Sequence, residues 1–204
     1  MKPQVELSHY EFLSYIDIDR FSSYYYQLKY ILEIEPDSFL EIGGGIGILK
    51  KLLPDNLKYY NLDINKGLNP DIIGNIEKLP VKDNKFEIVG CFQVLEHLPF
   101  EKFPHLLEEL KRISSKYIFI SLPFANHKIM ADLFLPKIKK KTFRLLVPKF
   151  YQTHKFDGQH FWEIGKKNYS FKKIYKLIEE KFKVVESFTP DENTYHQFFL
   201  LKKK

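Results

Sequence analysis

A run of glycines follows a short apolar segment in the first quarter of the chain. Residues 38–42, Ser-Phe-Leu-Glu-Ile, lead into residues 43–47, Gly-Gly-Gly-Ile-Gly. A turn of this kind lets a ligand lie against bare backbone, and the helix that follows offers unpaired N–H groups. Ile48 stands where a dinucleotide-binding turn has its last glycine, and the phosphate-loop sequence Gly-Lys-Ser/Thr does not follow. Both phosphate-binding interpretations are therefore disfavoured.

Two acids near this turn suit a positively charged nucleoside. Glu41 lies two residues before Gly43, facing the place where a cationic group of the ligand would sit. Asp63 ends the next apolar run, twenty residues after Gly43. A carboxylate at that position is well placed to accept hydrogen bonds from both hydroxyls of a ribose.

A second polar cluster occupies residues 154–163, which hold the only tryptophan, two histidines, two acids and a glycine. In one interpretation this is a loop that Asp157 caps and Trp162 packs. In the other it is a substrate wall, in which His160 or Glu163 takes a proton from an attacking hydroxyl. The residues expected to contact the substrate are Trp162, Tyr195 and His196.

The order of apolar segments predicts the elements that position these residues. Apolar runs that alternate with helical patterns are typical of a doubly wound α/β fold with a mainly parallel sheet. Residues 184–188 and 196–201 are joined by a short turn, so they would pair antiparallel at the sheet edge. We predict a Rossmann-like, seven-stranded sheet with this edge hairpin and with helices on both faces. The other expected strands are residues 38–42, 57–63, 71–73, 86–91 and 117–122, and the expected helices are residues 10–34, 46–53, 103–114 and 171–182.

One stretch breaks this rhythm, because residues 123–169 show no clear periodicity. So long an irregular stretch is unusual in a compact domain, so we expect short helices and a functional lid or substrate wall there. The whole chain, residues 1–204, is expected to form a single domain. Its expected parts are an amino-terminal helical segment (1–35), a cofactor-binding core (36–122), the lid or substrate insertion (123–169) and a carboxyl-terminal helix with edge strands (170–204).

Length and composition favour a single intracellular globular domain. The chain has 204 residues, of which 44% are hydrophobic, and a single cysteine, Cys91. Such a chain can bury a core without disulfides, and Cys91 is expected to be a small buried hydrophobe. No apolar run is long enough to span a membrane, and the first residues lack the apolar run of a signal peptide. We expect a cytoplasmic protein.

Positive charge is concentrated in the second half of the chain. Lys and Arg number 10 against 15 Asp and Glu in residues 1–100, and 22 against 11 in residues 101–204. The surplus peaks between Lys137 and Arg144, where a solvated face or a mobile loop is the plainest interpretation. The alternatives are an anionic substrate, a nucleic acid, and an anionic membrane that brings the site to a lipid-linked acceptor. Nucleic acid is the less favoured because the patch has few aromatic neighbours beyond Phe134 and Phe143.

Taken together, the motifs of the first half resemble those of the class I S-adenosylmethionine-dependent methyltransferases, small-molecule type. In that family the pattern acid-x-Gly-x-Gly-x-Gly contacts the methionine part of the cofactor, and Asp63 matches the acid that binds the ribose. The residues that match the glycine pattern are Glu41, Gly43, Gly45 and Gly47.

Two further segments extend this resemblance. Residues 74–80, Gly-Asn-Ile-Glu-Lys-Leu-Pro, are similar to the family's Gly-Asp-Ala-x-x-Leu-Pro element, so Asn75 stands where an aspartate usually bonds the adenine. Asn can also accept through its side-chain oxygen. The resemblance implies S-adenosylmethionine as cofactor, with further contacts from Ile64, Ile76, Phe92 and Gln93.

The resemblance does not imply a metal. Glu96 and His97 are similar to a metal-binding pair of some relatives, but the further acid expected three positions before Glu96 is Gln93 here. We predict no metal, and a structural role in which Glu96 and His97 bond the neighbouring loop.

The implied reaction is an in-line transfer of a methyl group to a small-molecule or carrier-linked acceptor, which we expect to occur at oxygen. Residues 92–95, Phe-Gln-Val-Leu, replace the Asn-Pro-Pro-Tyr signature used for amide or base nitrogens. Two alternatives stay open. The chain would be a catalytically silent cofactor-binding or partner subunit, or a nucleic-acid methyltransferase that uses the patch from Lys137 to Arg144.

Overall fold

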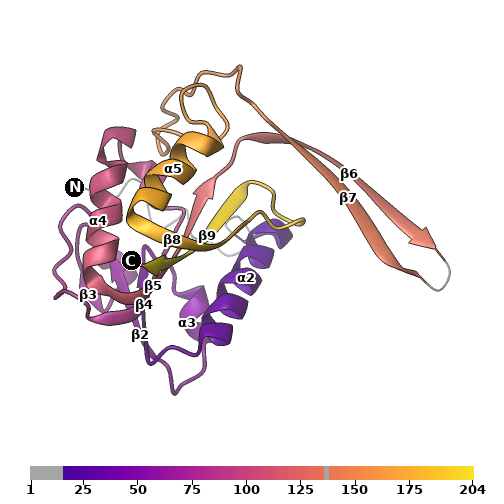
Figure 1. Ribbon diagram of the computed structural model, residues 1–204. Coiled ribbons are helices and arrows are strands. Elements are labelled where there is room, and N and C mark those ends of the chain that lie inside the picture. The colour runs from indigo at the N-terminus through magenta and orange to yellow at the C-terminus, as the bar shows by residue number, and fades with distance from the viewer. Residues whose placement is uncertain (1–15, 136–137) are drawn as a thin grey trace.

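The computed structural model describes residues 16–135 and 138–204 of the chain. Its main sheet has seven strands in the order β3-β2-β1-β4-β5-β9-β8 (Figure 1). The strands of this sheet are β1 (Ser38–Ile42), β2 (Lys58–Asp63), β3 (Ile72–Ile73), β4 (Phe86–Phe92), β5 (Ser114–Pro123), β8 (Phe182–Phe188) and β9 (His196–Lys203). Strands β1 to β5 are parallel, whereas β9 pairs antiparallel with both β5 and β8. The predicted seven-stranded, mainly parallel sheet with an antiparallel edge hairpin is thereby confirmed.

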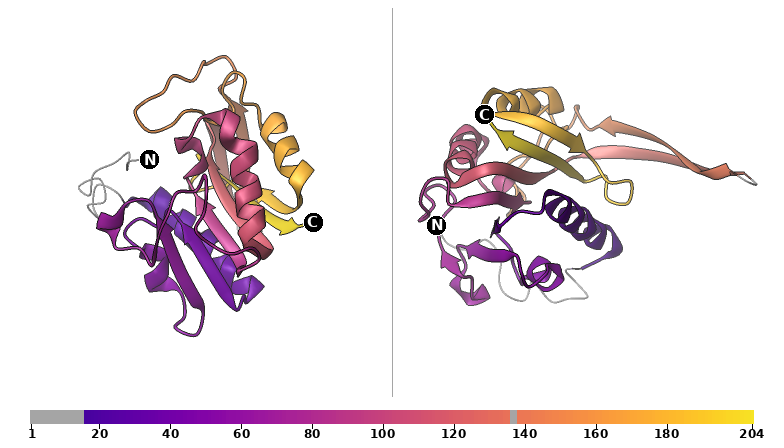
Figure 2. Two further views of the ribbon diagram at one scale, coloured as in Figure 1. Left: turned by 90° about the vertical axis from the view of Figure 1, so that its left-hand side faces the viewer. Right: turned by 60° about the horizontal axis from the view of Figure 1, so that its bottom comes forward.

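Helices cover both faces of this sheet, as predicted (Figure 2). They are α2 (Ile18–Ile34), α3 (Ile48–Leu52), α4 (Phe103–Ile113) and α5 (Phe171–Lys181). Side chains of α2 and α3 pack with Phe39, whereas those of α4 and α5 pack with the next residue, Leu40. Because successive side chains of a strand point to opposite faces, the short apolar run of β1 contributes to both cores.

Local signals in the sequence explain where these helices begin and end. The Asp17 side chain accepts a hydrogen bond from the Arg20 N–H at 2.6 Å, which caps the amino end of α2. Helix α3 is shorter than the expected 46–53, because Gly47 caps it in a left-handed conformation (φ 70°) and Leu53 is extended before Pro54. Residues 10–15, which we also expected to be helical, lie outside the described residues.

The segment after β5 forms a long two-stranded arm. It consists of β6 (Asn126–Leu135) and β7 (Ile138–Pro148), which pair antiparallel and project away from the sheet (Figures 1 and 2). The expectation of short helices in residues 123–169 was therefore wrong. From Lys128 to Leu133 polar or flexible side chains alternate with Ile129, Ala131 and Leu133, which is the two-residue period of a strand.

This topology places the carboxyl ends of five parallel strands along one edge of the sheet. The glycine turn follows β1, Asp63 ends β2, and the segment from Gln93 to His97 follows β4. In open α/β sheets this edge is where ligands bind. Among the helices of the described ranges, none combines the length and the apolar character that crossing a bilayer requires.

Candidate functional site

The glycine turn lies in close contact with the strands on either side of it. The Gly43 N–H donates to the Leu62 carbonyl at 2.8 Å, and Gly43 has a φ of 74°. A Cβ atom at Gly43 would come within 2.5 Å of the Val94 side chain, which belongs to the segment after β4. Glycine is required here, both for the left-handed backbone and for this close approach.

Glu41 lies beneath the turn rather than in solvent. It accepts a hydrogen bond from the Tyr59 hydroxyl at 2.5 Å, and a Cβ at Gly44 would come within 2.9 Å of its Oε2. Burial raises the pKa of Glu41 to about 7, against the lowering effect of the bond from Tyr59. A cation bound above the turn would favour the ionised form of this carboxyl group.

Asp63 is buried at the carboxyl end of β2. Its Oδ1 accepts from the Asn65 N–H at 2.7 Å, and the backbone of Gly45 also bonds this carboxylate. Burial raises the pKa of Asp63, against the lowering effect of the backbone hydrogen bonds. The second strand thus holds an acid directly beside the glycine turn, where a ribose is expected. Ile64 follows it and is partly buried.

The other expected cofactor contacts lie along the same edge of the sheet. Asn75 follows β3, and its Oδ1 accepts from the Glu77 N–H at 3.0 Å, while Ile76 beside it is buried. Phe92 ends β4 and packs edge-on against Phe119. Gln93 has a positive φ of 55°, and its side chain donates to the Ser121 hydroxyl at 3.1 Å. Their contacts with a cofactor stay predictions.

Backbone hydrogen bonds join residues 160–164 to the ends of β4 and β5. The Phe161 N–H donates to the Glu96 carbonyl at 2.9 Å, and the Ile164 N–H donates to the Pro123 carbonyl at 2.9 Å. The Phe124 N–H donates to the Tyr195 carbonyl at 2.7 Å. The polar cluster found in the sequence is therefore fixed at the same edge of the sheet as the glycine turn.

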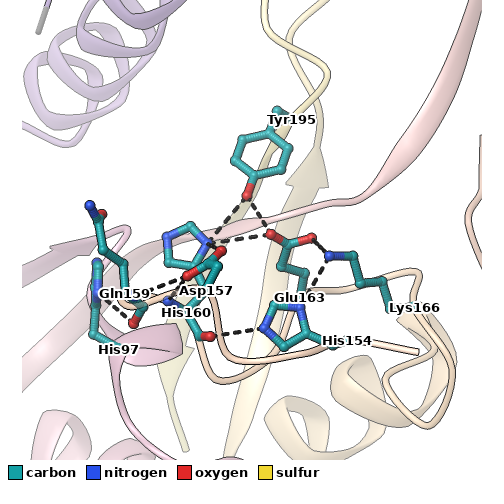
Figure 3. Close-up of polar contacts among 8 residues, drawn as sticks. All are labelled: His97, His154, Asp157, Gln159, His160, Glu163, Lys166 and Tyr195. Carbon is teal, nitrogen blue, oxygen red and sulfur yellow. Dashed lines mark hydrogen bonds and ion pairs between the residues drawn. The ribbon is translucent and has the colours of Figure 1, made fainter. Parts of the chain in front are cut away.

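Two residues of this cluster, His160 and Glu163, lie beside Tyr195 (Figure 3). The Tyr195 hydroxyl donates to Glu163 Oε1 at 2.8 Å, and His160 Nδ1 lies 3.4 Å from the same oxygen. The other oxygen, Oε2, forms an ion pair with Lys166 Nζ at 2.7 Å. The Asp157 side chain accepts from the His160 N–H at 2.7 Å, as expected of a capped loop. The structure thus shows the capped loop and brings His160, Glu163 and Tyr195 together.

Neighbouring charges shift the pKa of His160 and the pKa of Glu163 in opposite directions. Burial alone would lower the pKa of His160, but the hydrogen bond with Glu163 and the nearby carboxyls raise it above its ordinary value. Burial would raise the pKa of Glu163, but the bonds from His160, Lys166 and Tyr195 lower it to about 2. Glu163 is therefore a stable anion and a weak base, whereas His160 is the stronger base of the two.

Two expected substrate contacts lie in the interior. Trp162 is fully buried, packs against Phe100 and Phe103, and donates from Nε1 to the Leu98 carbonyl at 3.1 Å. His196 is buried, its Nδ1 lies 2.8 Å from the Ser23 hydroxyl, and burial lowers its pKa to about 3. These contacts favour structural roles instead of substrate contact. Trp162 packs in the core, and His196 joins β9 to α2 through Ser23. Tyr195 remains the substrate candidate with an exposed surface.

Glu96 and His97 bond the neighbouring loop, but not in the same way. His97 Nδ1 lies 3.1 Å from the Gln159 carbonyl, and its ring packs edge-on against His160. Glu96 bonds the loop through its backbone carbonyl only. Its side chain is fully buried, and neither carboxyl oxygen has a hydrogen-bond partner among the described residues.

Two groups of side chains in this region could hold a metal ion. Donor atoms of Glu96, His97 and His160 lie within 4.8 Å of one another, as do those of Asp157, His160 and Glu163. The sequence led us to expect no metal, and this stays a prediction. Elemental analysis of the purified chain, before and after treatment with a chelator, tests it.

We expect Glu96→Gln to flatten the dependence of stability on pH. Burial raises the pKa of Glu96 to about 8 from 4.5, although the charge of His160 lowers it. Between these values the folded chain binds a proton that the unfolded chain has lost, so stability falls as pH rises. Glutamine does not titrate. We expect the variant to be more stable than the original chain at pH 9 by about 1 kcal/mol, measured by urea unfolding.

The exposed Glu101 provides the matched control. Glu101→Gln makes the same substitution at the protein surface, and its free energy of unfolding should stay close to that of the original chain. Parallel stability curves for the original chain and Glu96→Gln would contradict the assignment of a buried proton.

Two contributors to the site were not identified from the sequence. Lys166, three residues after Glu163, forms an ion pair with its carboxylate. In a chain with so many lysines, the sequence does not single out this one for such a role. Tyr59 holds Glu41 from the neighbouring strand. Its position opposite Phe39 in the strand register becomes visible only once β1 and β2 are paired.

Comparisons with known proteins agree with this geometry. A profile of the methyltransferase domain family matches residues 18–171, about three quarters of the chain. An uncharacterized protein of Methanocaldococcus jannaschii is 38% identical over 80 residues, which cover 36% of this chain and 34% of that protein. The match thus spans about a third of that relative's length.

Two solved structures share the fold. An S-adenosylmethionine-dependent methyltransferase from Aquifex aeolicus superposes with a TM-score of 0.60 at 15% identity, over 98% of this chain and 100% of that one. Magnesium protoporphyrin IX methyltransferase from Synechocystis, with S-adenosylmethionine bound, superposes with a TM-score of 0.58 at 15% identity. The superposition covers 92% of this chain and 81% of that one. Because the family profile covers about three quarters of the chain, the chain belongs to the methyltransferase domain family, and its fold agrees with that of these two methyltransferases.

Proposed function

We propose that the chain transfers a methyl group to a hydroxyl oxygen of a small-molecule or carrier-linked acceptor, with His160 as general base. The observation that supports this proposal is the position of His160. It lies with Glu163 and Tyr195 at the carboxyl ends of β4 and β5, the edge that also holds the glycine turn. Cofactor binding and proton transfer would then occur at neighbouring parts of one edge.

The residues of this edge fit the cofactor. When bound, S-adenosylmethionine supplies a methyl group on a positively charged sulfur, open to in-line attack. The turn that starts at Gly43 offers backbone close to the ligand, and Asp63 offers a buried carboxylate for the ribose hydroxyls. Glu41 adds a carboxyl beneath the turn, where it would favour a positive charge.

Between the two proposed catalytic residues, the pKa values favour His160 as the base. Glu163, with a pKa of about 2, binds a proton too weakly to take one from a hydroxyl. Its Oε1 instead faces His160 Nδ1 at 3.4 Å, which favours the tautomer with the proton on Nδ1. Glu163 would therefore be a positioning residue that orients the ring.

The proton then has a defined route. The Nε2 atom of His160 would take the acceptor's hydroxyl proton as the new O–C bond forms and the C–S bond breaks. The resulting imidazolium is stabilised by the Glu163 carboxylate, which Lys166 and Tyr195 hold in place. General base catalysis of this type contributes about 100-fold or more to the rate.

We expect Glu163→Gln to shift the acidic limb of the pH–rate profile to lower pH. The base must be neutral, so activity rises as pH passes the pKa of His160, which the hydrogen bond with Glu163 raises against the effect of burial. Removing that negative charge lowers the pKa of His160. The profile of kcat against pH for the original chain and the variant measures the shift. An acidic limb at the same pH in both would show that Glu163 does not act on the titrating group.

A search for acceptors tests the proposal itself. The chain is incubated with S-adenosylmethionine carrying a ¹³C-labelled methyl group, first with glycans and lipid-linked sugars, then with amines and carboxylates. We expect a new methyl ether signal in the NMR spectrum of one hydroxyl-bearing class. Transfer only to nitrogen would overturn the assignment to oxygen, and cofactor binding without turnover on any class would favour a catalytically silent subunit.

A further inference from the structure

The arm formed by β6 and β7 carries an apolar face that is exposed to solvent. In its register Ile129 lies opposite Leu145, and Ala131 lies opposite Phe143, so these four side chains share one face, called here the arm face. Ile129 is 62% exposed, Leu145 58% and Phe143 61%. Exposed apolar side chains gathered on one face mark a site of interaction with another molecule or with a membrane.

The opposite face of the arm is bonded to the body of the protein. The Lys128 ammonium donates to the Asp191 carbonyl at 2.8 Å, and the Arg144 guanidinium pairs with the Asp191 carboxylate at 2.8 Å. Arg144 also donates to the Thr189 carbonyl at 2.6 Å. These bonds hold the arm against the turn between β8 and β9, and they leave the arm face turned away from that turn.

Positive charge is concentrated toward the far end of the same arm. Residues 138–144 have the sequence Ile-Lys-Lys-Lys-Thr-Phe-Arg, with three consecutive lysines and no acid. An apolar surface next to a basic run suits the surface of an anionic bilayer. The apolar side chains can enter the acyl boundary while the Lys or Arg side chains bind the headgroups.

We propose that the arm face binds the surface of an anionic lipid bilayer, with Lys139, Lys140 and Lys141 on the lipid headgroups. Nucleic acid fits less well, because phosphate-binding surfaces are polar and would leave Ile129 and Leu145 exposed. A second copy of the chain that paired arm to arm would bring the same basic run, so the two runs would repel each other.

The base of the arm adjoins the candidate active site. The Asn126 side chain donates to the Thr194 carbonyl at 2.7 Å, next to Tyr195. An arm bound to a bilayer would thus hold the site close to acceptors that are attached to lipids. This inference goes beyond the proposed function, because membrane binding requires neither cofactor nor turnover.

Vesicle flotation of the full chain without cofactor tests the proposal. The vesicles are made of phosphatidylcholine, alone or with phosphatidylglycerol, at low and at physiological salt. We expect the bound fraction to be at least about tenfold higher on the anionic vesicles and to fall with salt, since each basic residue near the surface contributes about fivefold. Equal binding to both vesicle types, or no binding to either, would overturn the proposal.

Variants separate the arm face from the basic run. The combined change Ile129→Ser, Phe143→Ser and Leu145→Ser should reduce binding about tenfold or more, whereas Val185→Ser, at an exposed position of β8, should not. Changing Lys139, Lys140 and Lys141 to Glu should abolish the preference for anionic lipid. The same change at the exposed Lys172, Lys176 and Lys183 controls for net charge and should preserve that preference.

Two further results would assign the arm to another partner. Light scattering that shows a dimer of the original chain but a monomer of the serine variant would assign the arm face to a second copy. Binding of an RNA homopolymer, lost in the lysine variant while vesicles stay unbound, would assign the basic run to nucleic acid. Either result overturns the bilayer assignment.

Circular dichroism spectra and melting temperatures that match those of the original chain show that the variants are folded.

Discussion

Asp63→Ala is expected to weaken the binding of S-adenosylmethionine about 30-fold to 1,000-fold, or roughly 2 to 4 kcal/mol, as measured by isothermal titration. The carboxylate is buried at the end of β2, beside the glycine turn. There it would accept two charge-assisted hydrogen bonds from the ribose. Alanine removes both and leaves the hydroxyl groups without partners at a buried position.

Two variants separate this effect from a change in the local backbone. Asp63 also accepts from the Asn65 N–H at 2.7 Å, so its loss could reshape the loop. Asp63→Asn keeps an oxygen acceptor but loses the charge, and should lose less affinity than alanine does. Asp55→Ala, at an exposed position before β2, should bind the cofactor as the original chain does. Full affinity in Asp63→Ala would refute the ribose assignment.

His160→Gln is expected to lower kcat about 100-fold while the affinity for S-adenosylmethionine stays within about twofold. Glutamine can keep a hydrogen bond to Glu163, but it cannot carry a proton away from the acceptor. The effect should fall on turnover because His160 contacts Glu163, Tyr195 and His97 at the ends of β4 and β5, and not the glycine turn itself.

The measurement is steady-state kinetics on the acceptor found in the labelling search, together with titration of the cofactor. His127→Gln, at an exposed histidine at the base of the arm, serves as the matched control and should retain the original kcat on a soluble acceptor. An unchanged kcat in His160→Gln would return His160 to a structural role. A loss of cofactor affinity of the same size as the loss of turnover would show that His160 shapes the cofactor site.

Much of the fold could be predicted because burial leaves a periodic pattern in the sequence. The sequence of β1 places apolar side chains on both faces, as in a strand that is covered on both sides. The spacing of Leu106, Leu107 and Leu110 indicates a helix with one buried face. The hairpin of β8 and β9 was predictable for a different reason, since the short connection between the two strands favours antiparallel pairing.

The arm was missed because its pattern does not come from burial in a core. Ile129, Ala131 and Leu133 alternate as a strand does, but their face is exposed. The sequence between β6 and β7, Pro-Lys, also lacks the glycine or asparagine that signals a hairpin turn. The candidate site was partly predictable, because His160 and Glu163 are neighbours in sequence. The contribution of Lys166 and the buried positions of Trp162 and His196 depend on packing between distant segments.

The most direct test of the proposed site is a crystal structure of the chain with S-adenosylhomocysteine, the demethylated product. Both ribose hydroxyls are expected at roughly 3 Å from the Asp63 carboxylate, with the sulfur atom directed toward the side of the site that holds His160. A ribose bound away from Asp63, or a sulfur that faces away from His160, would contradict it.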